Sequence, residues 1–242
     1  MVTFLTGVIT EIPAGWDRMC GIITEKNGFK DQLRKYWKQR SRCLFVTSYP
    51  DRAKENDMTL IFYREALNRS GFEASCFDLL DNRYKQDFTR ERLASYDVIF
   101  LGSGRMPDQW KLLSEVKLRE TIKGEGEGPV FDGLIMGISA GAMNCAEMTY
   151  NWPEEPGDTD PSFPLFYQGL GLTNTQILPH YQDRYEMSVD GRSLFYDITV
   201  KDSKGHEFLC LPDYSFVVVT EEEENIYGPY GYYRDGEIIP VK

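Results

Sequence analysis

The chain has 242 residues, 41% hydrophobic and 27% charged, values that are ordinary for a globular protein with one large α/β domain. The formal net charge of −11 argues against a nucleic-acid partner, because phosphate binding requires clustered lysine and arginine. No apolar run approaches the roughly 20 residues that cross a bilayer, and the first residues are a poor signal peptide. We therefore expect a cytoplasmic protein with a single domain over residues 1–242.

Cysteine and histidine are sparse. The five cysteines are scattered, odd in number and without a CxxC pair, which fits buried free thiols in a reducing compartment. The two histidines, His180 and His206, form no ligand cluster with them in the sequence. Neither a metal nor an organic cofactor is expected.

Short apolar runs alternate with helical patterns along the chain. This alternation predicts a three-layer, doubly wound α/β fold with a mostly parallel sheet. The expected strands are residues 42–48, 73–78, 96–101, 132–136, 175–178, 206–211 and 216–220. Helices are expected over residues 56–70 and 109–122 and after the sequence GISAGAMN. The fold class is thus predicted before any functional residue is considered.

Sequence patterns at both ends of the chain and in one loop predict further elements. The Tyr-rich tail with RDGE at 234–237 predicts a terminal antiparallel hairpin. Residues 151–164 are rich in Pro, Asp and Glu and predict a surface loop. The segment before about Phe29 is harder to assign, but Val8, Ile9 and Ile23 indicate an extra hairpin.

The strongest local signal is GISAG at 137–141, between a predicted strand and a predicted helix. It matches the G-x-S-x-G nucleophile elbow, a sharp turn that presents a serine hydroxyl above the carboxyl ends of the strands. Small residues on either side let the strained chain pass. The alternative is a structural glycine turn with an incidental serine. The strand–turn–helix context favours Ser139 as a nucleophile.

A serine nucleophile needs a general base and an acid that orients it. His180 follows a predicted strand, so in a parallel sheet it reaches the same edge as Ser139. His206 precedes its strand and is expected on the surface. Asp213 follows the strand at 206–211 and could orient His180, although Asp in LPDYS is also a common turn residue.

Two backbone N–H groups are needed to stabilise an oxyanion. One is expected from Ala140, and the other from Gly104 in the loop GSGR at 102–105, where glycine permits a close approach. A phosphate site in this loop is disfavoured, because it lacks the Lys-Ser/Thr of a P-loop and a full GxGxxG. The order Ser, His, acid also differs from that of α/β-hydrolases, in which His comes last.

Together these motifs resemble the peptidase E (aspartyl dipeptidase) family and its cyanophycinase relatives. The shared features are a strand ending in a glycine loop, GxSAGA, PH after a strand, and LP-acid before a strand, over most of the chain from about Arg42. The resemblance implies a class I glutamine amidotransferase-like, flavodoxin-like fold with serine in place of the amidotransferase cysteine. It also implies roles for five residues: Ser139 as nucleophile, His180 as base, Asp213 where peptidase E has a glutamate, and Gly104 and Ala140 as oxyanion donors.

The resemblance further implies a small peptide substrate, a dipeptide with N-terminal Asp, whose β-carboxylate needs a cation. Arg105, Arg184 and Arg192 are the candidates, since guanidinium pairs bidentately with carboxylate, although each alone fits a surface arginine. The family usually reads GGGN where this chain reads GSGR, which motivates a non-catalytic ligand-binding protein as the alternative. A cysteine amidotransferase is disfavoured, because Cys145 lies beyond the elbow. The oligomeric state is open, although such domains often form homodimers.

Overall fold

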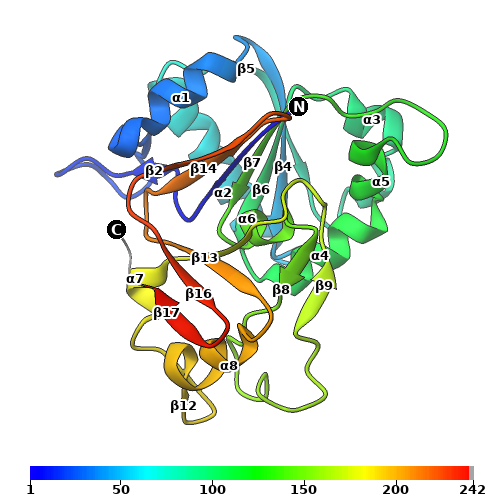
Figure 1. Cartoon of the computed structure of the whole chain (residues 1–242). Helices are drawn as coiled ribbons and strands as arrows, with labels where there is room; N and C mark the ends of the chain where they lie inside the picture. Colours follow the sequence, from blue (N-terminus) through cyan, green and yellow to red (C-terminus); the bar gives the residue numbers. More distant parts are fainter. Residues whose placement is uncertain (240–242) are drawn as a thin grey trace.

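The computed structural model describes residues 1–239, and its main element is a seven-stranded sheet in the order β15-β14-β1-β7-β6-β4-β5 (Figure 1). Five neighbouring strands run parallel: β1 (Val2–Thr6), β7 (Leu134–Ile138), β6 (Val98–Gly104), β4 (Ser41–Ser48) and β5 (Ala74–Leu80). Two antiparallel strands complete one edge: β14 (Phe216–Val219) and β15 (Glu224–Tyr227). The predicted α/β class with a mostly parallel sheet is confirmed.

Helices cover both faces of this sheet and make the fold three-layered. The helices are α1 (Phe29–Tyr36), α2 (Ala53–Arg69), α3 (Arg90–Ala94), α4 (Met106–Glu115), α5 (Leu118–Lys123), α6 (Ala140–Asn144), α7 (Tyr181–Arg184) and α8 (Val200–Asp202). Strand side chains alternate between two cores: Phe100 packs with residues of α1 and α2, while Leu101 packs with residues of α3, α4 and α5. None of the helices within residues 1–239 has the length and apolar character needed to span a bilayer.

A second, four-stranded sheet adjoins the first, in the order β10-β13-β16-β17. Its strands are β10 (Gln176–Pro179), β13 (Glu207–Leu211), β16 (Gly231–Arg234) and β17 (Glu237–Ile239). The predicted terminal hairpin is confirmed as β16–β17, which turns at Asp235 and Gly236. Figure 1 shows this sheet below the main sheet, with α7 and α8 beside it. The strands predicted at 175–178 and 206–211 therefore pair with each other rather than extending the main parallel sheet.

Smaller elements complete the described chain. They are the hairpin β2 (Thr10–Glu11) and β3 (Ile22–Ile23), the pair β8 (Met148–Tyr150) and β9 (Phe166–Gln168), the pair β11 (Ser188–Val189) and β12 (Arg192–Ser193), two 3₁₀ turns, Lys26–Gly28 and Lys85–Asp87, and a π-helical segment, Leu194–Thr199. The hairpin expected near Ile9 and Ile23 is present, and residues 151–164 form the loop between β8 and β9.

Two features differ from the sequence-based expectations. The helix expected over residues 109–122 is divided into α4 and α5, because Lys117 adopts a left-handed conformation with φ 54°. The strand β1 was not expected, yet it lies inside the main sheet, between β7 and β14. The predicted single domain over residues 1–242 includes residues 240–242, which lie outside the described part of the chain.

Candidate active site

The sequence at 137–141 forms a sharp turn between β7 and α6. Ser139 links the two elements with φ 56° and ψ −112°, a conformation that L-residues rarely adopt. Its backbone N–H donates to the Thr6 carbonyl oxygen at 2.7 Å, which ties the turn to the end of β1. The Ser139 side chain is thereby held in one place at the carboxyl edge of the main sheet.

The two glycines of the turn are required by close packing. A Cβ on Gly137 would lie 2.8 Å from the Ala142 Cα, and a Cβ on Gly141 would lie 2.1 Å from the Leu101 carbonyl oxygen. Glycine at these positions therefore lets α6 pack directly on β6 and β7. This steric reason alone would also fit a purely structural turn, so the functional interpretation depends on what surrounds Ser139.

The structure brings Ser139, His180 and Asp213 together in one hydrogen-bonded chain. The Ser139 Oγ lies 2.9 Å from the His180 Nε2, and the His180 Nδ1 lies 2.7 Å from an Asp213 carboxylate oxygen. His180 and Asp213 follow β10 and β13, whose last residues, Pro179 and Leu211, pair directly. The side chains of His180 and Asp213 are 18% and 23% exposed, whereas Ser139 is buried, with 6% of its surface exposed.

The end of β1 packs against this group. The sequence analysis did not predict this contact. A Cβ on Gly7 would lie 3.0 Å from the Asp213 Oδ1 and 3.3 Å from the His180 ring. The Thr6 hydroxyl donates to the Ser215 carbonyl at 2.9 Å, just beyond Asp213. A short apolar run followed by glycine was the only sequence signal for this support, and it does not reveal which strands β1 pairs with.

A second contact to the acid comes from α7. The Asp213 backbone N–H donates to the Gln182 side-chain oxygen at 3.0 Å. Gln182 lies two residues after His180, so the same short helix that follows the histidine also anchors the loop of the acid. His206, by contrast, is exposed and its ring stacks on Phe166 at 4.4 Å, outside this group.

Gly104, at the end of β6, also needs to be glycine. Its φ is +142°, and a Cβ there would lie 2.5 Å from the Tyr49 ring and 2.8 Å from the Ser48 Cβ. Ala140 is the first residue of α6 and is buried. Its N–H donates to no backbone or side-chain acceptor within residues 1–239. Their predicted roles as oxyanion donors stay predictions.

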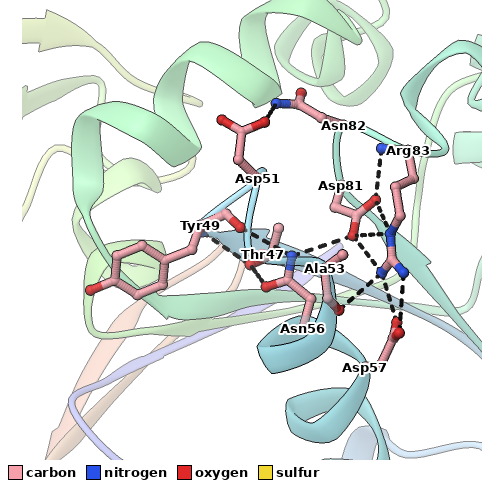
Figure 2. A network of polar contacts seen from close by, with 9 residues as sticks. All are labelled: Thr47, Tyr49, Asp51, Ala53, Asn56, Asp57, Asp81, Asn82 and Arg83. Carbon is pink, nitrogen blue, oxygen red and sulfur yellow. Dashed lines mark hydrogen bonds and ion pairs between the residues drawn. The ribbon is translucent and has the colours of Figure 1, made fainter.

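A buried polar network holds the chain that carries Tyr49 (Figure 2). The Thr47 hydroxyl donates to the Asn56 side-chain oxygen at 2.6 Å, and the Asn56 amide donates to the Tyr49 carbonyl at 3.0 Å. The same amide reaches the fully buried Asp81 carboxylate at 3.3 Å, which also pairs with Arg83 at 2.7 Å. Figure 2 shows the Tyr49 ring pointing away from this network. The same ring lies close to Gly104.

The three candidate arginines are not gathered as free cations around Ser139. Arg105 contacts Glu155, and the Arg184 Nη1 lies 2.5 Å from the Glu154 Oε1. Both glutamates belong to the loop between β8 and β9. Arg192 is exposed on β12 and forms no ion pair within residues 1–239. Two of the three guanidinium groups thus already have a carboxylate partner, a feature that the sequence did not reveal.

One cavity borders the loop at Gly104, and a second, larger one lies elsewhere. A cavity of about 280 Å³ is bordered by Tyr49, Arg52, Arg105 and Lys111, directly beside this loop. A larger cavity of about 770 Å³ lies against α3 and α5 and includes none of the predicted site residues. The smaller cavity is thus bordered by Arg105, while neither cavity is lined by Ser139, His180 or Asp213.

The site offers few alternatives for a metal or another nucleophile. His180, Asp183 and Asp213 have ligand atoms within 4.8 Å of one another, but both His180 nitrogens are already hydrogen-bonded. Burial raises the pKa of the Cys145 thiol well above its usual range, so this cysteine stays protonated and is a poor nucleophile. Ser139 is the nucleophile candidate of the site, because its hydroxyl is hydrogen-bonded to a histidine that an acid orients.

Comparisons with known proteins show which family and which solved structures the chain is similar to. The family model of peptidase family S51 matches residues 24–227. A crystal structure of a peptidase from an acI-B1 actinobacterium superposes with a TM-score of 0.60 at 14% identity, over 100% of this chain and 92% of that one. A second crystal structure, described as a peptidase E protein from Listeria monocytogenes EGD-e, superposes with a TM-score of 0.52 at 15% identity, over 93% of this chain and 96% of that one. No curated protein matches the chain.

Proposed function

Because the chain belongs to peptidase family S51, it is a serine-type peptidase, and we propose that Ser139, His180 and Asp213 are its catalytic triad. The observation that carries this proposal is the continuous pair of hydrogen bonds, 2.9 Å and 2.7 Å long, from Ser139 through His180 to Asp213. A serine hydroxyl is a weak nucleophile unless a positioned base removes its proton, and this geometry supplies that base.

In the proposed reaction, the Ser139 Oγ attacks the scissile carbonyl carbon while the His180 Nε2 takes the hydroxyl proton. Asp213 accepts from the Nδ1–H of His180, which holds the imidazole in the tautomer that leaves Nε2 free as a base. The tetrahedral oxyanion is stabilised by the backbone N–H groups of Ala140 and Gly104. His180 then protonates the leaving amine, and a water molecule activated by His180 hydrolyses the acyl-enzyme.

For the substrate, we propose small peptides, with dipeptides that carry N-terminal Asp as the first class to test. Arg105 supports this choice, because it follows the proposed oxyanion donor Gly104 and borders the 280 Å³ cavity. Its contact with Glu155 has to open before it can bind a substrate carboxylate. Arg184 forms the same kind of ion pair, with Glu154. Of the three candidate arginines, Arg192 is the one that forms no ion pair within the described residues.

The test is hydrolysis of Asp-Leu and of the matched neutral dipeptide Asn-Leu by wild type and Ser139→Ala. We expect wild type to cleave Asp-Leu faster, and the variant to lose roughly 10³-fold or more in kcat, as is usual when a triad nucleophile is removed. Equal cleavage of the two dipeptides would contradict the acidic preference and leave the triad intact. Undiminished cleavage by Ser139→Ala would contradict the triad itself.

If neither dipeptide is cleaved, a fluorophosphonate probe separates the remaining outcomes. Labelling of wild type but not of Ser139→Ala would support Ser139 as the nucleophile, and other peptides would then be tested as substrates. Absence of labelling, with the fold intact by circular dichroism, would contradict an activated Ser139.

A further inference from the structure

The outer face of α2 carries an exposed stripe that the catalytic site does not use. The helix buries Asn56, Ala66 and Leu67 on its inner side. On the outer side, Lys54, Met58, Ile61 and Glu65 follow one another at spacings of four, three and four residues, which places them along one line of the helix. Met58 and Ile61, at the centre, are 46% and 47% exposed. The stripe is therefore apolar in the middle, positive at one end and negative at the other.

This pattern is complementary to itself in the antiparallel direction. Lys54 and Glu65 are equally far from the midpoint of the stripe, as are Met58 and Ile61. A second copy of α2, rotated about a two-fold axis through that midpoint, would place Lys54 opposite the partner's Glu65 and Met58 opposite the partner's Ile61. Each of these contacts would occur twice, as it must in an interface with two-fold symmetry.

The charged ends of the stripe are available for such contacts. Lys54 forms no ion pair within residues 1–239. Glu65 lies 3.6 Å from Arg64 and 3.7 Å from Arg69 on the same helix, long contacts between exposed side chains. Exposed pairs of this kind contribute little to stability, so Glu65 can exchange them for a lysine across an interface.

Exposed apolar side chains also lie on the loop between β2 and β3, which contacts α2. Gly21 packs against the Phe62 ring of α2 so closely that a Cβ would lie 2.5 Å from it. The loop exposes Ile12, Trp16 and Met19, of which Trp16 is half exposed. Half of the ten large hydrophobic side chains exposed within residues 1–239 thus lie on α2 and this loop. Exposed apolar side chains that gather on neighbouring elements are typical of an interaction site.

We propose that α2 and the loop between β2 and β3 form the two-fold interface of a homodimer. A single helix pair is small for a stable interface, which buries about 1,200 Å² or more in total, so the loop has to contribute with Trp16. No residue of the proposed triad belongs to this surface. An experiment can therefore contradict the proposed dimer without contradicting the proposed catalytic triad, and the reverse also holds.

Sedimentation velocity at 1–100 μM protein, in about 150 mM salt that screens repulsion between two acidic chains, tests the proposal. We expect wild type to dimerise over this range. Lys54→Glu and Glu65→Lys should each weaken the dimer by roughly tenfold, because each places like charges at both copies of one contact. The double variant Lys54→Glu/Glu65→Lys should restore wild-type association. Lys204→Glu, an exposed reversal elsewhere, should change nothing.

Ile61→Asp gives the stronger perturbation, since it would bury an unpaired charge twice, and it should weaken the dimer by roughly a hundredfold or more. Circular dichroism checks that each variant is folded. A wild type that stays monomeric at 100 μM would overturn the proposal. So would a dimer that Ile61→Asp leaves intact, or a double reversal that associates no better than the two single ones.

Discussion

The backbone N–H of Ser139 donates to the carbonyl oxygen of Thr6 at 2.7 Å, so the first strand of the chain holds the proposed nucleophile. The next residue, Gly7, packs under the His180 ring and the Asp213 carboxylate. One short strand end thus contacts all three members of the proposed triad. Its backbone sets their relative positions without contributing a reacting group.

Gly7→Ala tests this support. The added Cβ would lie 3.0 Å from the Asp213 Oδ1 and 3.3 Å from His180, so we expect the imidazole to be displaced. A misplacement of about 1 Å in a catalytic group can lower the rate by about 100-fold, and we expect kcat to fall by roughly 10- to 100-fold with little change in KM. Gly7→Val should lose more. A Gly7→Val enzyme with wild-type kcat would contradict the positioning role.

Gly104→Ala tests the proposed oxyanion loop. The alanine Cβ would collide with the Tyr49 ring at 2.5 Å, so the loop and its N–H have to shift, and we expect kcat to fall by roughly 100-fold. Gly157→Ala is the matched control, because Gly157 also has a positive φ, 95°, but open space where the Cβ would be. Equal kinetic losses in the two variants would show that backbone strain alone, rather than oxyanion geometry, explains the effect.

Glu155→Gln tests whether the loop between β8 and β9 competes with an acidic substrate. Removing this carboxylate leaves Arg105 with only a longer contact, 3.8 Å, to Asp108. Because an exposed charge pair is worth about 1 kcal/mol, KM for Asp-Leu should fall by roughly three- to tenfold. KM for Asn-Leu should not change. Glu154→Gln makes the same comparison for Arg184. A change that is equal for both dipeptides would exclude a selective role for the arginine concerned.

Asp202→Asn tests a half-buried carboxylate outside the site. Burial raises the pKa of Asp202, while the Tyr150 hydroxyl, which donates to it at 2.7 Å, opposes that shift. Above the unfolded-state pKa, the folded protein therefore holds this proton more tightly, and its stability falls as pH rises through the folded-state pKa. Asparagine still accepts from Tyr150 but does not titrate. Urea unfolding should show the variant gaining stability relative to wild type between pH 3 and pH 7, and a constant difference would contradict this assignment.

Much of the candidate site could be predicted because its signals are local. The turn at Ser139, the strand ends before His180 and Asp213, and the glycine loop at Gly104 each have a short sequence pattern that the physics of strand ends explains. His180 was expected near Ser139 as part of one parallel sheet. It reaches Ser139 from the second sheet instead, because alternation and apolar runs do not reveal which strands pair.

What could not be predicted depends on pairing between distant residues. The sequence of Val2–Thr6 contains nothing that predicts its pairing with β7 and β14. Glu155 contacts Arg105 and Glu154 contacts Arg184. These residues are far apart in the sequence, so no local pattern predicts the contacts. The break at Lys117 was hidden for another reason, since lysine has no preference for the left-handed conformation that it adopts there.

The position of β1 has a consequence for how the molecule acquires activity during synthesis. Phe4 lies opposite Met136 on one side and Val218 on the other, so this strand cannot complete its pairing until β14 has emerged from the ribosome. Contacts of such large separation form slowly, because the intervening chain must first be ordered. Until β14 has formed, one edge of β1 stays unpaired, and a chain that ends before Asp213 cannot yet form the hydrogen-bonded group with Ser139 and His180.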